Sequence, residues 1–403
     1  MVSAPTVWPN RIIGEGEEAP DQLLANPRNW RIHPKAQQDA LAGILSEVGW
    51  VQRVIVNQRT GHMVDGHARV ALAISRQEPT VPVLYVDLSE EEERAVLATF
   101  DPLGAMTVTD QEQLDALLAE VSVKDEALRA MLDGLRSEPL PGLTDPDAVP
   151  EVAEPISKTG DLWLCGEHRL LCGDSTKAED VERLMAGEKA ALLWTDPPYG
   201  VNYVGGTGLM IANDGAEGLP ALLQGVFAAV SPVLAPGAPF YIARPAGALS
   251  TTFGNAVDGA GWQLHEELQW VKDAMVLGHS DYHLRHETIM YGWLPGPGRS
   301  GRGNHEGSRW FGGNAETSVF EIPRPKASPD HPTGKPVELV ERQVGNSSLH
   351  DDIILDLFLG SGTTLIACER TGRVCFGMEL EPAYVDVAIR RWEAFTGERP
   401  ERE

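Results

Sequence analysis

The chain has 403 residues, of which 42% are hydrophobic and 23% are charged, and its formal net charge is −26. This length predicts two or three globular domains, and the acidic excess counts against tight non-specific binding to nucleic acid. The sequence has no run of about 18 apolar residues that would predict a membrane-spanning helix. It begins with neither the basic start nor the apolar stretch of a signal peptide, so we expect a cytoplasmic protein.

Charge is unevenly distributed along the chain. Residues 269–350 carry nine basic and nine acidic side chains together with six histidines, although the chain as a whole is strongly acidic. If the protein contacts phosphates, we expect the contacts in this segment. The four cysteines have neither the spacing of a zinc site nor a histidine in a ligand pattern nearby, so we expect buried reduced thiols and no metal site.

A proline-rich acidic segment, residues 137–158, divides the sequence. It contains five prolines and five acidic residues with little apolar periodicity, which predicts an extended, solvated linker. We therefore expect an N-terminal domain over residues 1–136 and a C-terminal domain over residues 159–403.

In the N-terminal domain, apolar side chains recurring on one face predict a first helix over residues 36–48. Two short strands joined by a turn are predicted within residues 54–66. A helix and a buried strand over residues 81–88 follow, and Ser89 and Glu92 predict a capping box at the start of the next helix. Two further helices complete a small α+β domain.

In the C-terminal domain, strands and helices alternate, which predicts a doubly wound α/β sheet. The predicted strands are residues 162–166, 169–173, 191–196, 239–243, 268–272, 288–293, 353–358 and 374–380. A hairpin is predicted over residues 309–322.

The motif Asp196-Pro197-Pro198-Tyr199 directly follows an apolar strand. Ligands of open α/β sheets bind where strands end at their carboxyl edge. Consecutive prolines fix the backbone and remove two N–H donors, so Asp196 and the Pro197 carbonyl could accept both hydrogens of an amino group. Tyr199 offers a flat face on which a base extruded from a duplex could stack. An ordinary strand-end turn is the alternative.

A glycine loop, Gly360-Ser361-Gly362, follows a second buried strand, and Thr363 then opens a helix. Glycines let a ligand approach the backbone, and a helix N-terminus offers N–H groups to a carboxylate. The next strand ends in Glu379, about 20 residues on, where an acidic side chain suits ribose hydroxyls. The loop lacks a phosphate-gripping Gly-Lys-Ser/Thr, so a ligand with ribose but no triphosphate fits better.

These motifs, in this order, resemble the β class of amino DNA methyltransferases over residues 160–395. The resemblance implies S-adenosylmethionine as the cofactor and transfer of its methyl group to the exocyclic amino group of adenine in double-stranded DNA. It also implies the base flipping and restriction-modification roles of that class; a homodimer stays open. The implied catalytic residues are Asp196, Pro197, Pro198 and Tyr199, and the implied cofactor residues are Asp174, Thr333, Lys335, Asp356, Phe358, Gly360, Gly362, Thr363 and Glu379. Gly334 departs from the family's pattern, which commonly has a larger residue there.

Target recognition is expected in an insert of about residues 276–326. Arginine suits both phosphate contact and guanine reading, and the candidate DNA-binding residues are Arg285, Arg299, Arg302, Arg309, Arg324 and Lys326. A solvated surface is the alternative for each of them.

The N-terminal domain resembles a ParB-like domain over residues 20–100. The resemblance rests on Asn26-Pro27-Arg28-Asn29 and on the strand-to-helix junction that contains Gly66, His67 and Arg69. It implies a nucleotide site at that junction. A non-catalytic role in docking on DNA and a nuclease activity are the alternatives.

Two other functions remain open for the whole chain. N4-cytosine transfer is one, although such enzymes more often have Ser where Asp196 stands. The other is a ParB-like DNA-binding or partition protein whose methyltransferase fold no longer catalyses.

Overall fold

The computed structural model describes residues 8–107, 109–136, 139–200, 215–276, 281–296, 309–312, 315–325 and 334–403. The chain forms two compact units, Met1–Ser137 and Glu138–Glu403. In the described ranges, no helix is both long and apolar enough to cross a membrane.

The first unit contains a mixed sheet with strand order β1-β4-β2-β3. Its elements are β1 (Ile12–Glu18), α1 (Lys35–Glu47), β2 (Val54–Asn57), β3 (Met63–Asp65), α2 (His67–Ser75), β4 (Val81–Val86), α3 (Glu90–Ala105), α4 (Gln111–Glu120) and α5 (Glu126–Asp133). Strand β1 was not expected from the sequence and pairs antiparallel with β4. The predicted capping box is present, because the Ser89 N–H donates to Glu92 at 2.8 Å and the Glu92 N–H donates to the Ser89 hydroxyl at 3.3 Å.

The second unit has one sheet whose described strands follow the order β11-β9-β10-β8-β7-β12-β13-β6-β5-β14. Its strands are β5 (Leu162–Cys165), β6 (His168–Cys172), β7 (Leu192–Thr195), β8 (Pro239–Arg244), β9 (Gln263–Val276), β10 (Leu284–Trp293), β11 (Val319–Glu321), β12 (Ile353–Asp356), β13 (Val374–Glu379) and β14 (Glu401–Arg402). From β8 to β6 the neighbouring strands are parallel, as expected for a doubly wound sheet.

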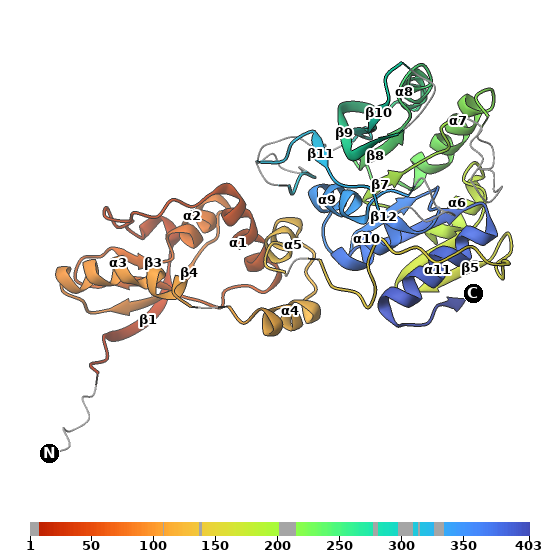
Figure 1. Cartoon of the computed structure of the whole chain (residues 1–403). Helices are drawn as coiled ribbons and strands as arrows, with labels where there is room; N and C mark the ends of the chain where they lie inside the picture. The colour runs from red at the N-terminus through yellow and green to blue at the C-terminus, as the bar shows by residue number, and fades with distance from the viewer. Residues whose placement is uncertain are drawn as a thin grey trace. The chain divides into compact units, whose positions relative to one another are not determined.

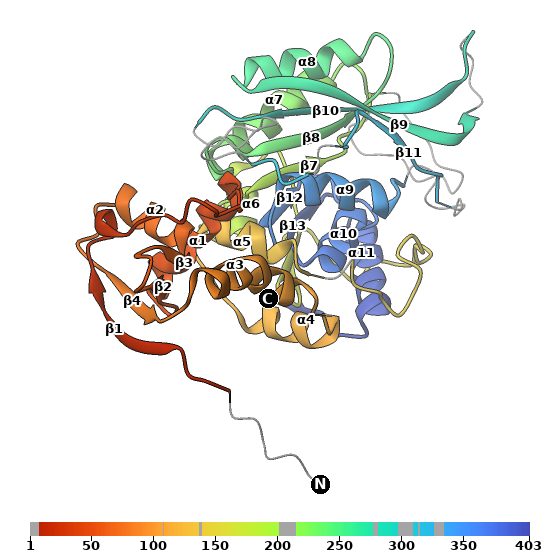
Figure 2. The ribbon, with the colours of Figure 1, turned by 90° about the vertical axis from the view of Figure 1, so that its left-hand side faces the viewer.

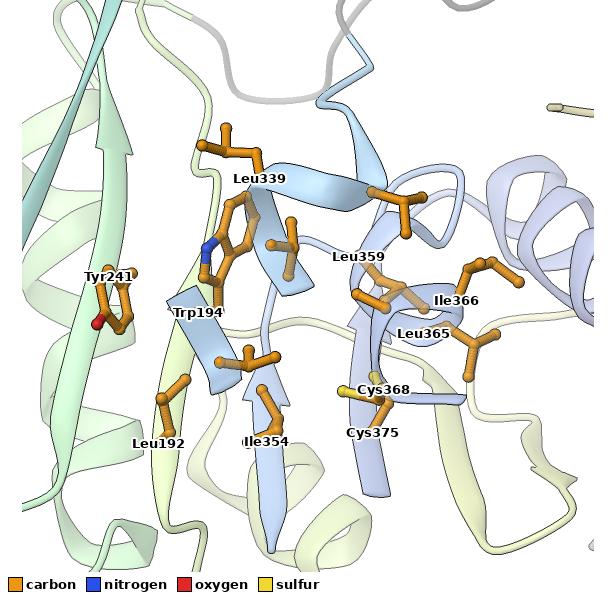
Figure 3. Packing of buried hydrophobic residues seen from close by; sticks show 14 of the residues in the cluster. Leu192, Trp194, Tyr241, Leu339, Ile354, Leu359, Leu365, Ile366, Cys368 and Cys375 are labelled. Carbon is orange, nitrogen blue, oxygen red and sulfur yellow. The ribbon is translucent and has the colours of Figure 1, made fainter. Parts of the chain in front are cut away.

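Helices cover both faces of this sheet (Figure 1). They are α6 (Ala178–Met185), α7 (Leu219–Val230), α8 (Ser250–Gly259), α9 (Val337–Ser347), α10 (Thr363–Thr371) and α11 (Pro382–Thr396). The first three pack in one apolar layer and the last three in the other. Figure 3 shows Trp194 of β7 beside Leu339 of α9 in the second layer. The four cysteines are buried and none forms a disulfide, as expected.

The sheet extends beyond its parallel core through a long antiparallel pair, β9 and β10 (Figure 2). The predicted hairpin over residues 309–322 is wrong. Its described residues contain only β11, which pairs parallel with β9, with Val319 opposite Gln269. The partner of this strand is therefore distant in sequence, and local pairing could not predict it.

Residues 139–158, which we call the strap, are mostly exposed, as their composition predicted, but their backbone is bound to the second unit. The Leu140 and Leu143 N–H groups donate to the carbonyls of Arg370 and Phe395, both at 2.8 Å. Asp386 accepts hydrogen bonds from the backbone of Ile156 and Ser157. The strap thus belongs to the second unit, because its backbone groups find partners there.

Candidate active site

Four loops of the second unit begin at the carboxyl ends of neighbouring parallel strands. Asp196 follows β7, Gly360 follows β12, Glu379 ends β13 and Asp174 follows β6. This edge is where ligands of such sheets bind. The sheet therefore brings together candidate site residues that were predicted from separate stretches of the sequence.

Asp196 has two carboxylate oxygens in different situations. Oδ2 accepts a hydrogen bond from Lys335 Nζ at 2.5 Å. Oδ1 is buried and has no hydrogen-bond partner among the described residues. A buried acceptor without a donor costs about 1–3 kcal/mol, so this oxygen marks a position where a ligand N–H or O–H would be stabilised.

Lys335 was predicted as a cofactor residue, and in the structure its ammonium group contacts Asp196. Its side chain is only 5% exposed and its Nζ lies 3.1 Å from Glu287 Oε2 and 5.5 Å from the ring centroid of Tyr199. The Tyr199 hydroxyl donates to Glu287 Oε2 at 3.1 Å. Glu287 also accepts from Lys272 Nζ at 2.5 Å. We call Asp196, Lys335, Glu287 and Lys272 the charged cluster.

Electrostatics keep Glu287 and Lys335 ionised. Burial alone would raise the pKa of Glu287, but the Lys335 and Lys272 ammonium groups outweigh it and lower that pKa to about 2. Burial would likewise lower the pKa of Lys335, but the carboxylates of Asp196 and Glu287 raise it above its ordinary value. Two ammonium groups and two carboxylates therefore share one buried site, and removing one leaves an unpaired charge.

Sequence patterns missed Glu287 and Lys272. Both lie on the long antiparallel pair, Lys272 on β9 and Glu287 on β10. Each lies at one end of an apolar strand segment, which is the only signal the sequence offered. Their pairing depends on the register in which His286 lies opposite Val271.

The glycine loop after β12 has the predicted geometry. Gly360 and Gly362 adopt φ values of 53° and 84°, in the left-handed region that favours glycine. A side chain at Gly362 would come within 2.9 Å of Ala388 Cβ, so this glycine allows α10 and α11 to approach closely. A side chain at Gly360 would meet only the Phe358 carbonyl, at 4.0 Å, so the backbone there borders open space.

Asp356 holds this loop to β7. It is 1% exposed, and it accepts hydrogen bonds from the Thr364 hydroxyl at 2.6 Å, the Thr195 hydroxyl at 3.1 Å and the Phe358 N–H at 3.1 Å. Burial outweighs these bonds and raises its pKa to about 7. These contacts give Asp356 a structural task at the loop. Thr363 is nearly buried, and its hydroxyl accepts from Arg391 at 3.4 Å.

Glu379 points into the glycine loop. Its carboxylate accepts from the Gly360 N–H at 2.8 Å and the Glu381 N–H at 2.9 Å. Burial raises its pKa despite these bonds. Asp174 instead accepts from the N–H and the hydroxyl of Thr176. Each carboxylate oxygen can accept more than one hydrogen bond, so both side chains keep acceptor capacity for a ligand.

The strap reaches the edge of this site. Asp147 Oδ1 accepts from the Val337 N–H, at the start of α9 and two residues after Lys335, at 2.9 Å. Arg391 donates to the carbonyls of Pro146 and Ser361, at 2.7 and 3.0 Å. The strap therefore contacts the segments that carry both Lys335 and the glycine loop, and no sequence motif indicated this.

The predicted DNA-binding arginines are only partly described. Arg285 is exposed and its Nε donates to the Lys272 carbonyl at 3.0 Å. Arg324 is exposed, its N–H donates to Asp273 at 3.1 Å, and Arg309 is half-buried. The remaining candidates, together with one candidate cofactor residue, lie outside the described residues: Arg299, Arg302, Lys326 and Thr333.

In the first unit, Gly66 caps α2 with a φ of 98°. The Arg69 guanidinium donates to Asp65 at 2.6 Å and to Gln52 at 2.7 Å. His67 Nε2 accepts from the Asn26 N–H at 3.3 Å, so the two predicted motifs of this unit are in contact. Burial, and then the charge of Arg31, lower the pKa of His67.

Comparisons with known proteins identify similar chains. Residues 190–390 match the family model described as DNA methylase, of the N6/N4 type. The chain is 28% identical over 147 residues to the type II methyltransferase M.BglI of Bacillus subtilis. The aligned residues make up 35% of this chain and 42% of that protein. It is 45% identical over 64 residues to the type II methyltransferase M2.DpnII of Streptococcus pneumoniae. These aligned residues make up 16% of this chain and 24% of that protein. The chain thus spans less than half of these two relatives.

Among solved structures, the M1.HpyAVI–SAM complex matches 55% of this chain and 97% of its own, with 21% identity and a TM-score of 0.43. PvuII DNA methyltransferase, which is cytosine-N4-specific, matches 56% of this chain and 86% of its own, with 16% identity and a TM-score of 0.42. The family match begins just before β7, ends within α11 and contains Asp196, Glu287, Lys335, the glycine loop and Glu379. Through residues 190–390, the chain therefore belongs to the N6/N4 DNA methyltransferase family.

Proposed function

We propose that the chain is a site-specific DNA methyltransferase that uses S-adenosylmethionine to methylate the exocyclic amino group of adenine. The single observation that carries this proposal is Asp196 Oδ1 at the carboxyl end of β7, which is buried and has no hydrogen-bond partner among the described residues. It lies in the Asp-Pro-Pro-Tyr motif, where two prolines leave carbonyls without competing N–H donors. An amino group with two hydrogens fits an acceptor pair made of Asp196 and the Pro197 carbonyl.

The residues around the glycine loop suit S-adenosylmethionine. Glu379 would accept from ribose hydroxyls, Asp174 would contact the adenine of the cofactor, and the open backbone at Gly360 would admit the ligand. The N-terminus of α10 would face its carboxylate. S-adenosylmethionine supplies a methyl group bonded to a positively charged sulfur.

Asp196 would act on the base. The lone pair of an adenine amino group is delocalised into the ring, and accepting its hydrogens favours a pyramidal nitrogen with an available lone pair. After methylation this nitrogen carries a positive charge and a surplus proton, which Asp196 is placed to accept. Tyr199 would stack on the flipped base, and stacking contributes roughly 1–3 kcal/mol.

The first unit would serve DNA binding. We propose that it is ParB-like and that the junction of Gly66, His67 and Arg69 contacts a nucleotide or the DNA backbone. The contact between His67 and Asn26 supports this, because it joins the two motifs behind the resemblance.

The test is transfer of labelled methyl groups from S-adenosylmethionine to DNA, followed by mass spectrometry of the nucleosides. N6-methyladenine is expected. Detection of N4-methylcytosine would support a DNA methyltransferase but contradict adenine as the target base. No methylated base on any DNA tested, with the chain bound to that DNA, would favour a non-catalytic DNA-binding protein.

A further inference from the structure

Lys335 lies between two carboxylates, and only one of them belongs to the catalytic motif. Its Nζ is 2.5 Å from Asp196 Oδ2 and 3.1 Å from Glu287 Oε2. A carboxylate paired with an ammonium group is a weaker acceptor for a neutral amino group, because its charge is already compensated. The contact with Lys335 therefore holds Asp196 in a form less suited to a base.

Glu287 joins three parts of the site. Its Oε1 accepts from Lys272 on β9, and its Oε2 accepts from the Tyr199 hydroxyl and lies beside Lys335. The residue is largely buried on β10, a strand packed between β8 and β9. A carboxylate fixed in this way offers Lys335 a permanent second partner.

We propose that Glu287 is a positioning residue that retains Lys335 when the amino group of the target base binds at Asp196 Oδ1 and Lys335 leaves Oδ2. This inference rests on the proposed function. Without Glu287, Lys335 would either remain on Asp196 or become a buried unpaired charge, which is strongly unfavourable. Glu287 also offsets the charge of Lys335 when positive charge develops on the amino nitrogen of the base.

Glu287→Gln keeps the shape of the side chain and removes its charge. In the full-length protein, kcat for methyl transfer is expected to fall roughly 10- to 100-fold, the loss of one interaction with a charged group. The dissociation constant for S-adenosylmethionine should change less than about twofold, because Glu287 is not among the cofactor residues. Glu287→Asp should recover part of kcat.

The matched control is Glu267→Gln on β9. Glu267 also forms an ion pair at 2.5 Å, with Arg244, but it is half exposed and does not contact Lys335. Its kcat should equal that of the wild type. An unchanged kcat in Glu287→Gln, or an equal loss in Glu267→Gln, overturns the proposal.

A crystal structure of Asp196→Ala gives a readout that needs no activity. We expect Lys335 Nζ to remain within hydrogen-bonding distance of Glu287. A Lys335 Nζ that lies beyond hydrogen-bonding distance of Glu287 overturns the proposal. If the wild type transfers no methyl group to DNA, the proposed function fails, and this structure still reports whether Glu287 retains Lys335.

Discussion

Glu93 in the first unit is a buried carboxylate and Glu287 in the second is a half-buried one, and their partners differ. Glu93 accepts from the amides of Asn26 and Asn57, at 2.8 and 2.5 Å, and from the hydroxyl of Thr60 at 2.6 Å. Glu287 is held by two ammonium groups and a phenol. Neutral donors fix loops around one carboxylate, whereas an ammonium group shared between two carboxylates can move between them.

The pKa values follow these surroundings. Burial would raise the pKa of Glu93, but the hydrogen bonds from Thr60, Asn57 and Asn26 lower it overall. The lysines lower the pKa of Glu287 to about 2. Asp356 accepts from hydroxyl and backbone donors, and burial raises its pKa to about 7. The three sites therefore differ in how they satisfy a carboxylate, and among the described residues of these sites the charged cluster alone contains a buried acceptor without a partner.

The largest expected effect concerns the strap, because the site of the second unit depends on a segment far away in sequence. A fragment of residues 159–403 should be less stable than one of residues 139–403 by about 4–6 kcal/mol, at about 1 kcal/mol for each hydrogen bond lost. Urea unfolding of the two fragments checks this. Equal stability, with equal affinity for S-adenosylmethionine, would mean that the strap contributes nothing to the site.

A smaller effect is expected at Glu93 and the three neutral side chains that donate to it. Glu93→Ala leaves the donors of Asn26, Asn57 and Thr60 without their acceptor and should destabilise the first unit by about 2–4 kcal/mol. Hydrogen exchange of the first unit in the full chain measures this, with the exposed Glu91→Ala as the control. Methyl transfer to DNA at saturating concentrations should persist. If Glu93→Ala loses methyl transfer while the first unit keeps its stability, Glu93 has a functional role, and the claim that only Glu287 of the two acts in transfer is wrong.

The smallest effect is a pH dependence at Asp356. Because its folded-state pKa, about 7, lies above its ordinary 3.8, protonated Asp356 contributes stability that is complete below about pH 4 and is lost as the pH rises through 7. Asp356→Asn cannot ionise, so its Tm deficit relative to the wild type should shrink by roughly 5–10 °C between pH 5 and pH 8, at about 1.4 kcal/mol per pH unit up to the folded-state pKa and roughly 2–4 °C per kcal/mol. The exposed Asp258→Asn is the control. A deficit that stays constant over this range would show that Asp356 is already ionised at pH 5.

Local patterns predicted much of the fold and one half of the site. Apolar strands, the capping box and the glycine loop depend on neighbours in sequence, so periodicity and spacing reveal them. The sheet then brings Asp196, Gly360 and Glu379 to one edge, as parallel strands require.

The rest depends on partners that are distant in sequence. Lys335 was assigned to the cofactor by resemblance, but 139 residues separate it from the carboxylate it contacts. Glu287 reaches it through the register of β9 and β10. The strap has the composition of a linker, yet its backbone groups and Asp147 bind the second unit. The composition of a segment indicates how polar it is, but it does not indicate which residues its backbone donors and acceptors bind.

The most direct test of the central claim is to measure methyl transfer and cofactor binding together in Asp196→Ala. In the proposed function Asp196 binds the base and not the cofactor, so transfer to DNA should fall by about 10²–10⁴-fold. The dissociation constant for S-adenosylmethionine, measured by calorimetry, should stay within about twofold of the wild type. Wild-type turnover in this variant, or a loss of cofactor affinity as large as the loss of transfer, would contradict the assignment of Asp196 to the base.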